Sequence, residues 1–185
     1  GRYGIKPDLV ATGGLDVFLA PDPNNYYVPA PPGMYLAAER FDPQGDLYSP
    51  TGYSAADGTS FSAPLVAGAA ALVKQRYPSY TAAQVRSALM NAAAQDVKTD
   101  DFGESVGITS TGAGRLDAGA ALAATVTAEP ASVSFGALQA GSGLPQPIAV
   151  TVVNHGLATV TLAAAVAPVV AASGAGVSDG CVDDD

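Results

Sequence analysis

The sequence is short of cysteine, histidine and basic residues, and two of these shortages exclude a class of structure or function. Among its 185 residues there is one cysteine, Cys181, so a disulfide within the chain is impossible. Eight Lys and Arg residues stand against 17 Asp and Glu residues, which gives a formal net charge of −9. The basic residues are scattered along the chain rather than clustered. We therefore do not expect nucleic acid as a partner, because phosphates need a cationic surface.

Long hydrophobic runs are also missing. The longest, residues 63–73, is broken by Gly68 and leads into Lys74 and Arg76. About 20 consecutive apolar residues are needed to cross a bilayer as a helix, so we expect no membrane span and interpret this run as a buried helix. Hydrophobic residues still make up 48% of the chain, which predicts a globular protein with a core.

The first half of the chain contains few regular elements. Leu9–Ala11 follow Pro7 and precede two glycines, a pattern that predicts a short strand. Residues 15–53 are rich in Pro, Asn, Gly and Tyr and show no sustained period, so they predict mostly loop with a short strand near Met34–Ala37.

Helical signals follow. Residues 60–77 are apolar on nearly all faces, which predicts a buried helix. A second helix is expected after Thr81, because Thr81 and Gln84 have the spacing of a capping box and are followed by an apolar stripe. Residues 112–117 then predict a turn into a short Ala-rich helix that ends near Ala124.

Beyond Thr125 the periodicity changes from helical to alternating. Apolar residues alternate over 133–135, 148–152 and 158–162, with Gly- and Pro-containing turns between them. This pattern predicts antiparallel β structure and a domain boundary, with one domain over 1–124 and a second over 125–185. The second has about 60 residues, too few for a complete β-sandwich of about 100, so we expect it to be truncated.

The segment 57–64, DGTSFSAP, is the most informative for chemistry, because it lies where loop becomes apolar helix. A hydroxyl on Ser60 would project at the positive end of that helix, where unpaired backbone N–H groups can face a developing oxyanion. Pro64 has no N–H to offer the carbonyl four residues earlier. A plain N-cap is the alternative interpretation, since Thr59 and Ser60 are both favoured there.

Three segments in the same order carry a family resemblance. Residues 58–68, GTSFSAPLVAG, resemble the nucleophile signature of the subtilisin-like serine peptidases. Upstream, 6–11 (KPDLVA) is similar to the strand that precedes the serine in that family, and 112–117 (GAGRLD) is similar to its closing turn. The resemblance spans 1 to about 124. It implies the C-terminal portion of an α/β domain with a doubly wound parallel sheet.

The resemblance also assigns roles. It implies that Ser60 is the nucleophile and an oxyanion donor through its N–H, with Thr59 supporting the oxyanion hole. The triad His and Asp and the oxyanion Asn of the family precede the strand at 6–11, so we expect this chain to be a fragment that lacks the N-terminal part of the catalytic domain. Thr12 also replaces the usual Pro. The implied substrates are peptides or proteins, and we assign no cofactor and no metal ligand.

A serine nucleophile needs a general base, and the one histidine is His155. It stands in an Asn-His-Gly sequence that predicts a turn between strands of the second domain, so we do not interpret it as the base. The fragment is therefore expected to be inert alone. We assign no role to the carboxylates Asp8, Asp16, Asp57 and Asp117. The nucleophile elbow of α/β-hydrolases is excluded, because it needs a glycine at position 62, where Ser stands.

The second domain resembles the immunoglobulin-like modules that follow some secreted bacterial peptidases, through residues 130–136 and 150–156. In such modules Cys181 would pair with a later cysteine. Together with the acidic charge, this favours an extracellular or cell-envelope location. The function expected is serine endopeptidase. Two alternatives stay open, a non-catalytic homologue and an Ig-like binding or adhesion module.

Overall fold

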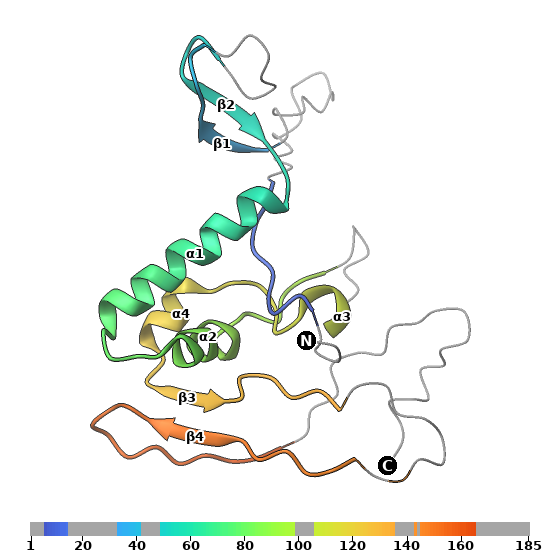
Figure 1. Ribbon diagram of the computed structural model, residues 1–185, viewed down its shortest axis with the longest axis vertical. Coiled ribbons are helices and arrows are strands. Elements are labelled where there is room, and N and C mark those ends of the chain that lie inside the picture. The colour runs from blue at the N-terminus through green and yellow to red at the C-terminus, as the bar shows by residue number, and fades with distance from the viewer. Residues whose placement is uncertain are drawn as a thin grey trace, which may run out of the picture. The chain divides into compact units, whose positions relative to one another are not determined.

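The computed structural model describes residues 6–14, 33–41, 49–98, 106–135, 143 and 145–165 (Figure 1). Cys181, Asp16 and the first residues of the chain lie outside these ranges. In chain order the elements are β1 (Met34–Ala37), β2 (Tyr53–Ala56), α1 (Thr59–Arg76), α2 (Ala82–Asn91), α3 (Ile108–Thr111), α4 (Ala118–Ala123), β3 (Val126–Glu129) and β4 (Thr151–Asn154). The chain divides into two compact units, one of residues 11–68 and one of residues 1–10 with 69–185.

The unit of residues 11–68 contains an antiparallel pair of strands. β1 pairs with β2 in the register Met34 to Ala56 and Ala37 to Tyr53. The rings of Tyr35 and Tyr53 stack across the pair with centroids 5.3 Å apart. The strand expected near Met34–Ala37 is thus confirmed as β1. The sequence analysis did not predict its partner β2.

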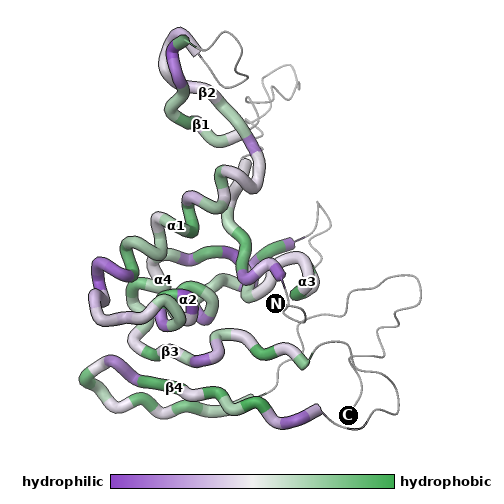
Figure 2. The backbone as a smooth tube through the Cα atoms, viewed as in Figure 1, coloured by the Kyte–Doolittle hydropathy of each residue, from purple (hydrophilic) through white to green (hydrophobic). Residues whose placement is uncertain are grey.

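Helix α1 begins at Thr59, directly after Gly58, whose φ of +144° suits glycine. Lys74 and Arg76 lie in its last turn, where they complement the negative end of the helix dipole. The prediction that α1 is largely buried is wrong for this structure. Ala69 and Val73 are buried, but Leu65 and Leu72 are 39% and 47% exposed. Figure 2 colours much of α1 white to green, and a helix with apolar residues on all sides needs neighbours on every side to be buried.

Helix α2 is capped as expected. The N–H of Gln84 donates to Thr81 Oγ1 over 3.2 Å, and the N–H of Thr81 donates to Gln84 Oε1 over 2.9 Å. This capping box satisfies two backbone donors at the start of the helix. The buried face of α2 carries Ser87, Ala88, Leu89 and Met90.

Residues 6–10 are held by the turn that follows α3. Val10 bridges Arg115 in parallel: the N–H of Val10 donates to Gly114 O (2.9 Å), and the N–H of Leu116 donates to Val10 O (2.7 Å). Arg115 also bridges Ala94 in antiparallel fashion. The expected strand at 9–11 is therefore a single parallel bridge among the residues described, and the doubly wound parallel sheet stays a prediction.

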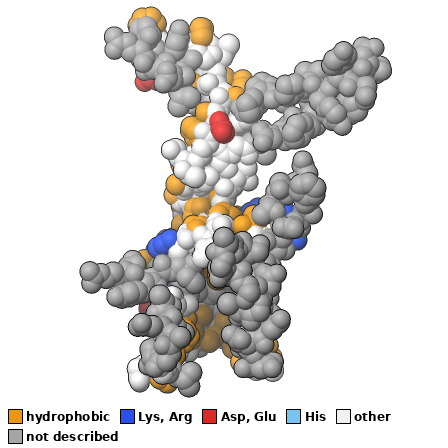
Figure 3. Space-filling view, turned by 90° about the vertical axis from the view of Figure 1, so that its right-hand side faces the viewer, with side chains coloured by type: hydrophobic (Ala, Val, Ile, Leu, Met, Phe, Trp, Pro, Cys, Tyr) orange, Lys and Arg blue, Asp and Glu red, His pale blue; other side chains and the backbone are white. Residues whose placement is uncertain are grey.

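The strands β3 and β4 form an antiparallel pair, in the register Val126 to Asn154 and Glu129 to Thr151. Antiparallel β structure beyond 125 is thus present, but 133–135 and 158–162 are not strands. Alternation of apolar and polar residues predicts which face of a strand is apolar, but a strand forms only where its backbone also pairs with a neighbouring strand. Figure 3 shows hydrophobic side chains in the lower part of the molecule, where β3 and β4 lie; Val152, Phe135 and Leu162 are among the exposed ones.

Strand β3 packs against helix α2, as Figure 1 also shows. Ser87 is fully buried, and its Oγ accepts a hydrogen bond of 2.7 Å from the N–H of Ala128. Helix α4 joins the same unit through Tyr77, whose hydroxyl donates to Leu122 O. The domain boundary at 124/125 and the Ig-like character of 125–185 stay predictions.

Candidate active site

Ser60 lies where the sequence predicts, in the first turn of a helix. It is the second residue of α1, Thr59 is the first, and both are exposed. The first four N–H groups of an α-helix have no partner within the helix, and these two residues supply two of them. Hydroxyl and backbone donors therefore lie together at an exposed helix start.

The turn before Ser60 is built from close backbone contacts. The N–H of Gly58 donates to Gly13 O over 2.6 Å, and the N–H of Phe61 donates to Gly58 O over 3.0 Å. Gly58 therefore connects residue 13 to the first turn of α1. Sequence reasoning named Gly58 for its turn but missed Gly13, because their contact spans 45 positions along the chain.

The helix dipole places partial positive charge at the start of α1, near Ser60. The first turn carries no acidic side chain, and the basic Lys74 and Arg76 stand in the last turn. The positive end of the helix dipole is thus free of a carboxylate within that turn. Pro64 lies inside α1 and lacks an N–H, so it leaves the carbonyl of Ser60 without its usual helical donor. This end of the helix can bind or stabilise negative charge.

His155 is engaged elsewhere. It directly follows β4, its Nε2 lies 2.8 Å from Thr127 Oγ1, and its N–H donates to Thr125 O over 2.7 Å. Its ring lies against Tyr80, with centroids 4.6 Å apart, and Tyr80 stacks on Tyr77. The sequence predicts His155 in a turn between two strands; it does follow β4, but the described residues after it, up to 165, form no second strand. Its imidazole serves the packing of β3 and β4 on the helices.

Comparison with known proteins decides the family. Residues 2–114 match the family model described as Subtilase family. The chain belongs to this family. The minor extracellular protease Vpr of Bacillus subtilis (strain 168) is 35% identical over 94 residues, which are 51% of this chain and 11% of that protein. Subtilisin BL of Lederbergia lenta is 45% identical over 56 residues, 30% of this chain and 21% of that protein.

A plant relative gives the same result. The subtilisin-like protease SBT5.3 of Arabidopsis thaliana is 38% identical over 89 residues, 48% of this chain and 10% of that protein. The chain thus covers about a tenth to a fifth of the length of these relatives. Membership of the subtilase family indicates an α/β fold for the matched part of the chain.

Two carboxylates of this subtilase have structural partners. Asp8 binds Arg86 through Nη2 to Oδ1 (2.6 Å) and Nε to Oδ2 (3.3 Å), and Lys6 Nζ lies 2.9 Å from Oδ1. The hydrogen bond from Arg86, aided by Lys6, lowers the pKa of Asp8 despite partial desolvation. Asp117 caps α4 by accepting from the N–H of Ala120. These contacts link residue 8 to α2 and cap the start of α4.

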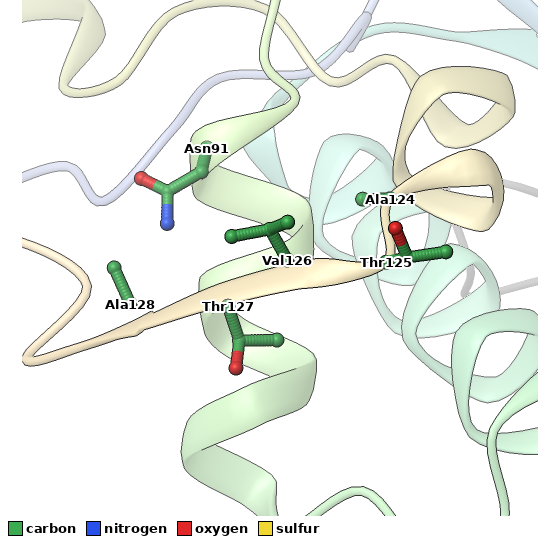
Figure 4. A pocket seen from close by; sticks show the side chains of 6 residues that line it. All are labelled: Asn91, Ala124, Thr125, Val126, Thr127 and Ala128. Atoms are coloured by element: carbon green, nitrogen blue, oxygen red, sulfur yellow. The ribbon is translucent and has the colours of Figure 1, made fainter. Parts of the chain in front are cut away.

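A hollow of about 390 Å³ lies between α2 and β3. It is lined by Asn91 and residues 124–128 (Figure 4). Figure 4 shows Val126 and Ala128 on one side of β3 and Thr127 on the other. The lining contains no carboxylate, histidine or other titratable side chain that could act as a general acid or base.

Two further observations concern the residues that the structure describes. No helix among them is both long and apolar enough to cross a membrane. No group of three or more His, Cys, Asp or Glu side chains among them is placed to hold a metal ion.

Proposed function

We propose that this chain supplies the nucleophile of a serine endopeptidase, with Ser60 attacking the scissile carbonyl of a peptide. The observation that carries the proposal is the position of Ser60 at the exposed, positive start of α1 within the family's signature segment. Ser60 Oγ forms the acyl-enzyme as the amine leaves, and water then hydrolyses the ester. Its own N–H, supported by Thr59, stabilises the oxyanion.

The general base comes from outside these 185 residues. This part of the proposal is supported by His155, the one histidine, whose ring contacts Thr127 in β3 and Tyr80 between α1 and α2. An unassisted serine hydroxyl is a weak nucleophile. In subtilisin, loss of the histidine alone costs about 2 × 10⁶ in kcat. The isolated chain is therefore catalytically inert.

A fluorophosphonate probe tests both parts. A longer protein that carries this chain together with a His-Gly-Thr segment should be labelled at Ser60, and its Ser60→Ala variant should not. Ser62→Ala is the matched control, since it removes a neighbouring hydroxyl and should retain labelling. The isolated 185-residue chain should stay unlabelled. Labelling of the isolated chain at the rate of the longer protein would place the base within these residues and contradict the proposal.

The alternative is a non-catalytic homologue. The same probe separates the two functions, because a longer protein that has an intact triad but resists labelling would favour a binding role.

We further propose that 125–185 begin an Ig-like module and that the protein acts outside the cell or in its envelope. Three observations support this: the antiparallel pair of β3 and β4, the charge of −9, and the similarity to Vpr, which is named as an extracellular protease.

A further inference from the structure

The chain passes very close to the nucleophile turn at two consecutive glycines. The carbonyl of Gly13 accepts the 2.6 Å hydrogen bond from Gly58, two residues before Ser60. Both partners lie in the unit of residues 11–68. The contact therefore reaches the turn from a segment far away in sequence.

No side chain fits at residue 13. A Cβ atom added there would contact Ser62 Oγ and would lie 2.7 Å from Gly58 O and 3.1 Å from Gly58 C. At Gly14 an added Cβ would lie 2.9 Å from the Cβ of Asp57. Real Cβ atoms do not approach other atoms this closely, so the backbone of Gly58 would have to move.

The two glycines in contact are needed for different reasons. Gly58 has a φ of +144°, which side-chain-bearing residues rarely adopt, while an added Cβ there would meet nothing closer than 3.9 Å. Gly13 is not in the left-handed region, so alanine would suit its own backbone. Its requirement is space alone, and a substitution there perturbs the turn rather than residue 13.

A shift of Gly58 is transmitted to the start of α1. The carbonyl of Gly58, which an added Cβ would push, accepts the N–H of Phe61 over 3.0 Å. Thr59 and Ser60 lie between these two bonded residues. The position of the Ser60 N–H and of its hydroxyl therefore depends on where Gly58 rests.

We propose that Gly13 is a positioning residue for Ser60: its bare Cα and its carbonyl form a seat that fixes Gly58 and the first turn of α1. The proposal rests on the proposed role of Ser60 as nucleophile. Misplacement of a reacting group by about 1 Å can cost about 10²-fold in rate. Gly13→Ala is expected to slow acylation by about 10- to 100-fold without weakening ligand binding.

The rate test uses fluorophosphonate labelling of the longer peptidase described above. In Gly13→Ala the limiting labelling rate should fall, while the probe concentration that gives half of that rate should stay unchanged. Gly119→Ala is the matched control, because Gly119 is exposed in α4 and an added Cβ there comes no closer than 3.4 Å to Asp117. Wild-type rates in Gly13→Ala, or a fall of the same size in Gly119→Ala, would overturn the proposal.

A double variant identifies the atom that transmits the effect. Gly13→Ala with Ser62→Ala removes the clash with the Ser62 hydroxyl but keeps the clash with the Gly58 carbonyl. Labelling should therefore stay slow in the double variant. Full recovery would show that residue 13 acts through Ser62 and not through Gly58, which contradicts the seat.

Amide hydrogen exchange tests the seat without catalysis. In the 185-residue chain the Gly58 N–H should be protected in the wild type and exposed in Gly13→Ala, with buried Ala88 in α2 protected in both. An unprotected Gly58 amide in the wild type would overturn the proposal, whether or not the variant folds. If the wild-type longer protein is never labelled, the proposed function fails, and exchange at Gly58 still decides whether Gly13 holds the turn.

Discussion

Ser87 offers the clearest test of how the β region is attached to the helices. Its side chain is fully buried in α2, and its Oγ accepts two hydrogen bonds, one from the N–H of Ala128 in β3 (2.7 Å) and one from Asn91 Nδ2 (2.9 Å). Ser87→Ala removes the acceptor and leaves the Ala128 N–H without its side-chain partner.

The magnitude follows from two opposing effects. A buried donor left without a partner costs about 1–3 kcal/mol. Alanine is the better helix former and returns about 0.5 kcal/mol. The expected net loss in the free energy of unfolding is about 1–2 kcal/mol. For a chain of this size it corresponds to a fall in Tm of about 2–8 °C.

Urea denaturation followed by circular dichroism measures this loss. Two variants, Ser79→Ala and Asn91→Ala, serve as controls. Ser79→Ala removes an exposed hydroxyl, and its free energy of unfolding should stay within about 0.5 kcal/mol of wild type. Asn91→Ala removes one donor but leaves the bond from Ala128, so it should cost less than Ser87→Ala. If Ser87→Ala also stays within about 0.5 kcal/mol of wild type, the bond from Ala128 does not hold β3 on α2 and the reasoning is wrong.

Three further predictions concern other contacts. Thr81→Ala removes the capping box of α2 and should cost about 1 kcal/mol in urea denaturation, and an unchanged midpoint would contradict it. The pKa of Asp8 lies below its ordinary 3.8, so the stability it gives with Arg86 is present above about pH 4 and is lost as pH falls through the lowered pKa. The urea midpoints of wild type and Arg86→Gln should thus differ most at pH 7 and converge toward pH 2, and a constant difference would count against the ion pair. Gly112→Ala should lower the free energy of unfolding by at least about 2 kcal/mol, because Gly112 has a φ of +57° and an added Cβ would meet the backbone of Pro7 and Asp8. Gly119→Ala should leave the stability nearly unchanged, and equal thermal midpoints for the two variants would refute the prediction.

Several elements could be predicted because their causes are local. The start of α1 near Ser60 follows from Gly58, from the early Pro64 and from the apolar residues after them. The start of α2 follows from Thr81 and Gln84, three positions apart. In each case the residues that decide the outcome lie within about one helical turn of one another.

The burial of α1 and the extent of the β structure could not be predicted in this way. Leu72 is as apolar as Val73, yet Leu72 is 47% exposed and Val73 is fully buried. Residues 158–162 alternate as well as a strand should, but they form none. Burial and strand pairing depend on which neighbours a segment finds, and hydropathy does not specify those neighbours.

By itself, the sequence determined the family, through the segment 58–68, and the place of Ser60 at a helix start, since both depend on neighbouring residues. Three contacts are visible only in the tertiary structure: Gly58 donates to Gly13, Arg86 binds Asp8, and Ala128 donates to Ser87. Each of these contacts joins residues at least 41 positions apart. Such pairs meet only once the elements have packed, because no local pattern of side chains encodes which distant backbone group will lie alongside.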